Sequence, residues 1–296
     1  MPEPLPNVRL QLLNTPENVV LVRGMLAGLA DELRIGESDL NDIRTAATEA
    51  CNNVVLHAYG GDPGPMEIDV HIDSGTVTVL VRDSGSGIGN RHEAAQANAG
   101  DAEESFDVSA EATDYPPPGI GLHVIQTLAH RVEFRRPPSG GTEVQMRFSL
   151  PVKALDPCSD ERGLATLALS ETPSTAMFSI APLSLARTIL PRLVSALAAR
   201  AHFSTDRISD AQLLADALAA HVPGALSGNQ LSVGVNVGPR EIELHIAPLN
   251  SGAAQHLLED CELDRLGGIV EKLTDHHQVA RIGPFEALTL GLRDNR

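Results

Sequence analysis

The chain has 296 residues, a formal net charge of −17 and a hydrophobic content of 42%, with no tryptophan. This length and composition suit two domains with aliphatic cores. A strongly acidic protein is not expected to bind nucleic acid or an anionic membrane surface, because both attract positively charged proteins. Its cysteines, Cys51, Cys158 and Cys261, lie far apart. That spacing argues against a disulfide framework or a cysteine-based metal site and suits a reducing compartment.

No apolar signal segment opens the chain, and no apolar run approaches the length of a membrane span, so we expect a cytoplasmic protein. Hydrophobic periodicity predicts the elements of the first half. They are a strand over residues 8–13, a helix over 17–33, a helix from about 38, strands over 66–72 and 76–82, a helix from 119 to about 129, and strands over 133–136 and 142–150.

The second predicted helix carries Glu49, Asn53 and His57, which are four residues apart and therefore share one face. The amide oxygen of Asn53 can complete the shell of Mg²⁺, which prefers oxygen ligands. The carboxylate of Glu49 can take a proton from a nucleophile. A polar stripe facing solvent would explain the same spacing, so this motif needs support from elsewhere in the chain.

Two glycine-rich turns provide that support. The strand over 76–82 runs into Asp83-Ser84-Gly85-Ser86-Gly87-Ile88-Gly89. Such a turn lets the backbone pass close to a flat ligand, while Asp83 can accept a hydrogen bond from an amine such as that of adenine. The second turn, Gly119-Ile120-Gly121-Leu122, opens a helix whose N–H groups and positive dipole end form a ready phosphate site. Each turn alone is an ordinary glycine loop, and their order after the polar helix is what matters.

Between the two turns, residues 90–118 form a long polar segment, and no Lys or Arg occurs between Arg91 and Arg131. A segment of this length within a compact domain predicts a functional lid or a disordered insert.

Together these motifs resemble the ATPase domain of the GHKL superfamily (gyrase, heat-shock chaperone, histidine kinase, mismatch repair) over residues 8–150. Within that superfamily they are most similar to the small serine protein kinases that act as anti-sigma factors in bacterial partner switching. The resemblance is carried by Glu49-Ala50-Cys51-Asn52-Asn53 with His57-Ala58-Tyr59, Asp83-Ser84-Gly85-Ser86-Gly87-Ile88, Gly119-Ile120-Gly121-Leu122 and Gly141-Thr142.

The resemblance implies ATP and Mg²⁺ as cofactors, with a sigma factor and a STAS-type anti-anti-sigma protein as partners. Asn53 would coordinate Mg²⁺, and Glu49 would be the base that activates a protein serine. Arg23, on the first helix, would contact the sigma factor. The residues implied in ATP binding are Asn53, Asp83, Gly85, Gly87, Ile88, Gly119, Ile120, Gly121, Leu122 and Thr142.

Two other functions stay open. A regulatory module that binds nucleotide without phosphotransfer is favoured by the lid, which is acidic where relatives often carry a basic residue. The ATPase half of a sensor histidine kinase ranks last, because no dimerisation helix pair with a phospho-acceptor His precedes Val8.

The second half predicts a degenerate copy of the first. Residues 151–173 read as a linker, and residues 174–296 repeat the element order of residues 8–150. The overall expectation is an α/β fold of two tandem two-layer sandwiches of the GHKL (Bergerat) type, each with a mixed, mainly antiparallel sheet covered by helices. The second copy would serve either as a pseudo-partner packed on the first or as an independent partner-binding module on a flexible tether.

The chemistry of the first half is missing from the second. Asp216 is a candidate replacement for Glu49, and the position of Asn53 falls on Ala220 or His221. Pro248 stands where the acidic residue of the first glycine turn should be. The lid shrinks to about residues 253–265, and His276-His277 reads as a solvated helix end.

Overall fold

The computed structural model describes residues 5–85, 120–137, 140–158, 174–226, 228–259 and 268–295. Elements of the first half are β1 (Val8–Leu13), α1 (Pro16–Leu33), α2 (Glu37–Asn53), a π-helical turn η1 (Val54–Ala58), β2 (Pro65–Asp73), β3 (Thr76–Asp83), α4 (Ile120–Leu128), β4 (Arg131–Arg135) and β5 (Thr142–Ser149). Elements of the second half are β6 (Ala176–Ile180), a 3₁₀ turn η2 (Leu183–Leu185), α6 (Ala186–Arg200), α7 (Thr205–Ala225), β7 (Leu231–Gly238), β8 (Glu241–Leu249), α8 (Ala253–Glu259), α9 (Ile269–Leu273), β9 (His276–Ile282) and β10 (Phe285–Arg293).

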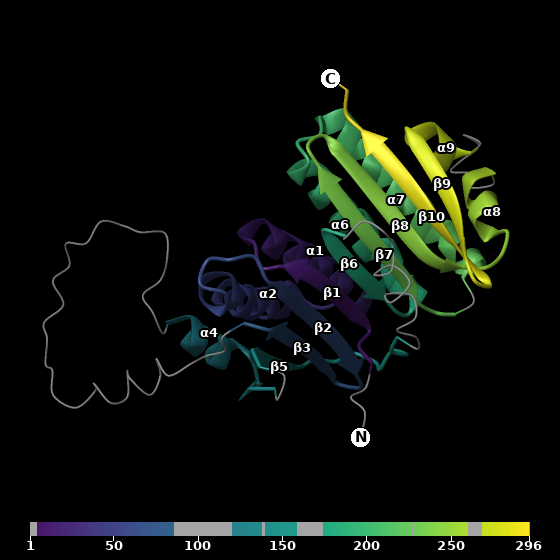
Figure 1. The fold of residues 1–296 in the computed structure, drawn as a ribbon. Helices are drawn as coiled ribbons and strands as arrows, with labels where there is room; N and C mark the ends of the chain where they lie inside the picture. The colour runs from purple at the N-terminus through teal and green to yellow at the C-terminus, as the bar shows by residue number, and fades with distance from the viewer. Residues whose placement is uncertain are drawn as a thin grey trace, which may run out of the picture.

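The described strands form one ten-stranded sheet in the order β4-β5-β3-β2-β1-β6-β7-β8-β10-β9 (Figure 1). The predicted α/β fold with helices on an antiparallel sheet is confirmed. The sheet departs from the expected mixed pairing, since every pairing between the described strands is antiparallel. The two halves also share this one sheet, rather than forming two separate sandwiches.

Counted outward from the centre, both halves have the same strand order. The first half runs β1-β2-β3-β5-β4, and the second runs β6-β7-β8-β10-β9. In each half, a strand is followed by two helices, a hairpin, further helix and a final pair of strands. This repetition supports the interpretation of the second half as a degenerate copy, which remains a prediction.

The two halves meet at their first strands and first helices. β1 pairs with β6, and α1 packs against α6. Neighbouring helices contact one another in the order α4-α2-α1-α6-α7, which follows the order of the strands. Figure 1 shows α1, β1 and β6 side by side in the middle of the molecule. One continuous cluster of buried aliphatic side chains therefore runs through both halves.

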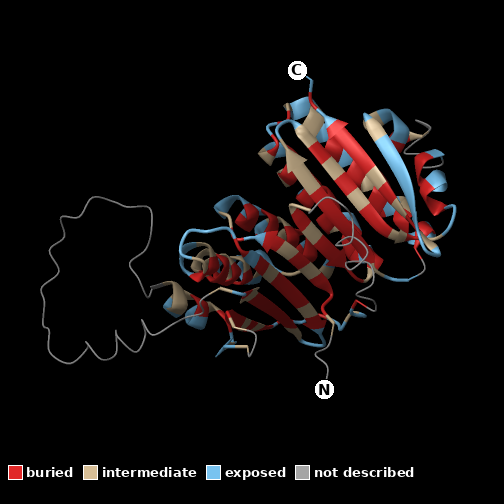
Figure 2. Ribbon diagram, viewed as in Figure 1, coloured by how far each residue is buried: buried red, intermediate tan, exposed pale blue. Residues whose placement is uncertain are grey.

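Burial differs between the strands inside the sheet and the strand at its edge. β3 alternates at its ends and is buried through its centre, whereas the edge strand β9 is exposed along almost its whole length (Figure 2). His276 and His277 begin this strand and do not end a helix, which corrects the sequence expectation. β9 lacks the buried alternate positions by which a strand is recognised in a sequence. No helix in the described part of the chain is both long and apolar enough to cross a bilayer.

The first part of the predicted linker is attached to the first half. The Leu155 N–H donates to the carbonyl oxygen of Ile72 at 3.1 Å, and the Cys158 N–H donates to that of Pro6 at 2.8 Å. The side chain of Asn7 donates to the carbonyl oxygen of Asp156 at 3.0 Å. Residues 151–158 thus lie along the start of β1 and the end of β2. This part of the predicted linker is therefore attached to the first half and is not a flexible tether.

Candidate functional site

Glu49 and Asn53 lie on the side of α2 that faces α4. The neighbouring side of α2 is buried in the core through Ile43, Ala46, Ala47, Ala50 and Cys51. A Cβ atom placed on Gly121, at the start of α4, would lie 3.0 Å from the Glu49 Oε2 atom and 3.7 Å from the Asn53 Oδ1 atom. The polar motif of one helix and the glycine turn of another, far apart in sequence, therefore converge. This convergence leaves backbone N–H groups at a helix start beside a carboxylate and an amide.

The helical face predicted for Glu49, Asn53 and His57 changes after Asn53. The chain enters a π-helical turn at Val54, which departs from the period of 3.6 residues. His57 lies in this turn and is exposed. The structure thus brings Glu49 and Asn53 together at Gly121, whereas His57 is not among the three nearest neighbours of that glycine.

Asp83 ends β3 directly opposite Thr142, which begins β5. The Gly85 N–H donates to the Asp83 Oδ1 atom at 2.9 Å. Burial raises the pKa of Asp83, and hydrogen bonds from Gly85 and Thr142 act in the opposite direction. The result is a buried hydrogen-bond acceptor at the end of a strand inside the sheet.

Close packing at this end of the sheet explains two of the glycines. A Cβ atom on Gly85 would lie 2.1 Å from the carbonyl oxygen of Ala58, and one on Gly141 would lie 1.9 Å from that of Asp83. Gly141 also has a φ of +80°, in the region that favours glycine. Neither position has room for a side chain.

Tyr59 connects the end of the α2 region to the first glycine turn. Its hydroxyl donates to the carbonyl oxygen of Pro65 at 2.5 Å and accepts a hydrogen bond from the Ser84 N–H at 2.8 Å. Burial raises the pKa of this hydroxyl. The sequence motif included Tyr59 only by resemblance, and the structure gives its role, which is to position the backbone beside Asp83.

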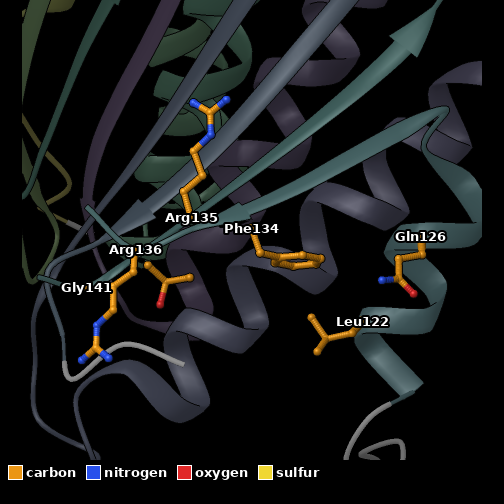
Figure 3. A pocket seen from close by; sticks show the side chains of 7 residues that line it. Leu122, Gln126, Phe134, Arg135, Arg136 and Gly141 are labelled. Atoms are coloured by element: carbon orange, nitrogen blue, oxygen red, sulfur yellow. The ribbon is translucent and has the colours of Figure 1, made fainter. Parts of the chain in front are cut away.

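A pocket of about 370 Å³ opens between α4 and the strands β4 and β5 (Figure 3). Its lining residues are Leu122, Gln126, Phe134, Arg135, Arg136, Gly141 and Thr142. Leu122 and Thr142 were predicted from the sequence. Phe134 and the two arginines were missed, because they belong to no motif and are brought to the pocket by the pairing of β4 with β5.

Several residues that the sequence predicts at the site do not take part in the contacts described above. Gly87, Ile88 and Gly119 lie outside the described residues, and Ile120 is described only as the first residue of α4. Arg23 is exposed on α1. The roles assigned to these residues stay predictions.

A second hollow, of about 660 Å³, lies near the ends of β1, β2 and β3 and includes Arg82, Glu67 and Glu143. Arg82 is bound to its own neighbours there, with nitrogen–oxygen distances of 2.7 Å to Glu143 and 3.1 Å to Glu67. It also contacts Asp69 at 2.6 Å. The Arg82 guanidinium is thus held by three carboxylates of the protein itself, and Asp83 at the end of β3 also lines this hollow.

The second half has a different arrangement at the corresponding place. The buried positions of α2 and α7 align as Ile43 with Ala211, Ala46 with Leu214, Ala47 with Ala215, Ala50 with Leu218, Cys51 with Ala219 and Val54 with Val222. This alignment puts Ala217 at the position of Glu49 and His221 at the position of Asn53. Asp216 falls one position away, so it does not replace Glu49 as the sequence suggested. Ala217 is completely buried.

In the second half, Glu286 lies at the position that corresponds to Thr142, in the region equivalent to that around Asp83. It pairs with Leu249 at the junction of β10 and β8, as Thr142 pairs with Asp83. Its carboxylate accepts hydrogen bonds from the Gly252 N–H at 2.8 Å and the Ala254 N–H at 3.2 Å, and only 9% of the residue is exposed. These bonds hold the start of α8, a helix that occupies part of the segment expected to be a short lid. The Glu286 carboxylate thus binds backbone N–H groups at the start of α8.

Comparison with known proteins gives a family match for the first half. Residues 12–148 match the family described as the histidine kinase-like ATPase domain. The serine-protein kinase RsbW of Bacillus cereus (strain AH820) is 26% identical over 133 residues, which cover 45% of this chain and 79% of that protein. RsbW of Bacillus mycoides (strain KBAB4) has the same identity and coverage. The first half therefore carries a histidine kinase-like ATPase domain of the GHKL type.

Among solved structures, the histidine kinase domain of the E. coli osmosensor EnvZ is 14% identical. The alignment covers 54% of this chain and 99% of that domain, with a TM-score of 0.27.

Proposed function

We propose that the protein is an ATP-dependent serine protein kinase that acts as an anti-sigma factor in bacterial partner switching. Its substrate would be an anti-anti-sigma protein of the STAS type, and its location the cytoplasm. The observation that carries this proposal is the convergence of Glu49, Asn53 and Gly121, where a Cβ on the glycine would lie 3.0 Å from the carboxylate. The similarity to RsbW, named a serine-protein kinase, supports the choice of reaction.

Each residue has a separate task in this reaction. Asp83 accepts a hydrogen bond from the adenine amine, and the backbone at Gly121 lies beside the phosphates. Glu49 takes the proton of a substrate serine hydroxyl while the serine oxygen bonds to the γ-phosphorus, the bond to the β–γ bridging oxygen breaks, and ADP leaves. Phosphoryl transfer of this kind depends mainly on positioning and charge neutralisation.

Mg²⁺ fits the side chains present at this place. The Asn53 Oδ1 and Nδ2 atoms lie 3.7 and 3.9 Å from the position of a Gly121 Cβ, so the side-chain amide lies beside the proposed phosphate position and can offer its oxygen there. In the described part of the chain, no group of three or more His, Cys, Asp and Glu side chains is arranged to hold a metal ion. A site of one protein oxygen plus phosphates and waters suits Mg²⁺, which keeps several waters. When bound, the ion would neutralise phosphate charge.

The second half is proposed to act as a covalent pseudo-partner of the kinase half. Support comes from β6, which covers the edge of β1, and from α6, which covers one side of α1. Ala217 and Glu286 provide no nucleotide chemistry at the positions of Glu49 and Thr142. Each chain would then bind one ATP, and Arg23 of α1 would be left exposed for a sigma factor.

The alternative is a regulatory module that binds nucleotide and partner without phosphotransfer. One observation favours it, namely that Arg135 in the pocket contacts Glu133 at 2.5 Å and Glu143 at 3.5 Å, so its charge is already shared. Incubation with γ-labelled ATP and a STAS-type protein distinguishes the two functions. The proposal predicts label on a serine of the STAS protein. Nucleotide-dependent complex formation without any label would favour the alternative.

A further inference from the structure

Phe134 is placed unusually for an aromatic residue of this chain. The protein has six phenylalanines, two tyrosines and no tryptophan. Phe134 is 38% exposed and is the one aromatic residue among the exposed large hydrophobic side chains of the described residues. It lies on β4 opposite Val144, which is buried in the core beneath the helices. The ring is therefore on the helical side of the sheet, where the nucleotide is proposed to bind.

The ring faces a pocket and not the open surface of the sheet. In Figure 3 the Phe134 ring and the Leu122 side chain point toward each other across this pocket, one from β4 and the other from α4. The same pocket is lined by Thr142, whose register partner is Asp83, and Leu122 is the residue after Gly121. The pocket therefore extends between the proposed adenine and phosphate positions.

The size and lining of this pocket suit part of a nucleotide. Its volume of about 370 Å³ falls within the range of small-molecule sites, which are mostly apolar with a few polar groups. An aromatic ring beside a nucleobase gains affinity by stacking, because every base offers a flat face. Partial exposure of a large ring in a pocket of this kind is explained if a ligand covers it.

We propose that Phe134, together with Leu122, forms the apolar wall against which the base and ribose of the bound nucleotide pack. Phe134 thereby sets nucleotide affinity without taking part in phosphoryl transfer. This inference rests on the proposed function, since it assumes a nucleotide held by Asp83 and Asn53. Its structural alternative is that Phe134 only shields the edge of the core, in which case its removal would lower stability and leave affinity unchanged.

Calorimetry on the full chain tests the affinity. Phe134→Ala should bind both ATP and ADP about tenfold more weakly than the wild type, because stacking on the base does not depend on the γ-phosphate. Leu213→Ala is the matched control, since Leu213 is a similarly exposed apolar residue on α7 of the second half, at 41%. This control should bind as the wild type does. Thermal melting checks that both variants are folded.

Because the chain has no tryptophan, Phe134→Trp creates a single-tryptophan protein that reports the same contact directly. Its emission should change on addition of ATP or ADP and saturate at the concentration found by calorimetry, whereas Leu213→Trp should not respond. Wild-type affinity in Phe134→Ala, or an unresponsive Phe134→Trp that still binds ATP, would overturn the inference alone. Failure of the wild type itself to bind ATP would overturn the proposed function and this inference with it.

Discussion

Leu10 of β1 lies directly opposite Phe178 of β6, and each residue is only 1% exposed. This pair stands at the centre of the sheet, where the first strand of one half meets the first strand of the other. A sheet edge left unpaired is open to association with another chain. Here each half closes the edge of the other within a single polypeptide, so the junction is part of the core.

The helices above this junction pack closely at Gly28. A Cβ atom on Gly28 of α1 would lie 2.5 Å from the carbonyl oxygen of Thr188 at the start of α6, whereas one on Gly24 would make an ordinary contact of 3.9 Å with Arg192. Gly28→Ala should therefore destabilise the protein by about 1–3 kcal/mol, as overpacking does. Gly24→Ala is the control on the same helix and should be neutral or stabilising. Equal melting temperatures for the two variants would show that the halves do not pack as described.

A chain ending at Leu150 tests the pseudo-partner more directly. It would expose the edge of β1 and the side of α1 that contacts α6, including the buried residue Leu10. We expect this truncated protein to dimerise or aggregate, because an unpaired edge beside an apolar face favours association. Light scattering during size-exclusion chromatography measures its mass. A soluble monomer with the ATP affinity and melting temperature of the full chain would support the tethered module instead.

The fold of the first half was largely predictable, because its hairpin strands alternate regularly and its helices are strongly periodic. The strands β6 and β9 were not predicted. β6 is short and follows a linker, and β9 is an exposed edge strand without an apolar face. Pairing of β1 with β6 depends on contacts between distant segments, and no local pattern encodes such contacts.

The site was predicted as a set of motifs, and the structure supplied their geometry. The convergence of Glu49 and Asn53 with Gly121 follows the expectation, whereas the π-helical turn that changes the direction of His57 has no signal in the sequence. Phe134 was overlooked because a single aromatic residue on a short strand resembles ordinary core. Glu286 was overlooked because its partners are backbone amides.

Asp83→Ala is expected to abolish adenine recognition with little loss of stability. Burial raises the pKa of this carboxyl group, so the cost of its desolvation offsets the hydrogen bonds that it accepts from Gly85 and Thr142 in the folded protein. Isothermal titration with ATP measures the affinity, and Asp73→Ala, at the exposed far end of β2, is the control. Unchanged ATP affinity in the Asp83 variant would remove the adenine role.

Glu286 makes stability depend on pH. The hydrogen bond from the Gly252 N–H, with a smaller contribution from the Ala254 N–H, lowers the pKa of its carboxylate in the folded state. A lowered carboxyl pKa contributes stability that is present above the unfolded value and is lost as pH falls through the folded value. Melting temperature should therefore fall more steeply below about pH 4.3, the ordinary value for glutamate, in the wild type than in Glu286→Gln. Parallel curves for the two proteins would contradict the contact.

The central claim is that Glu49 and Asn53 perform different steps at one site, and measuring binding and transfer in the same preparations tests it most directly. Glu49→Ala should bind Mg²⁺-ATP as the wild type does and phosphorylate the STAS-type substrate on the order of 10²–10⁴ times more slowly, as loss of a positioned base predicts. Asn53→Ala should lose Mg²⁺-dependent ATP binding itself. Serine phosphorylation by Glu49→Ala at the wild-type rate would contradict the account.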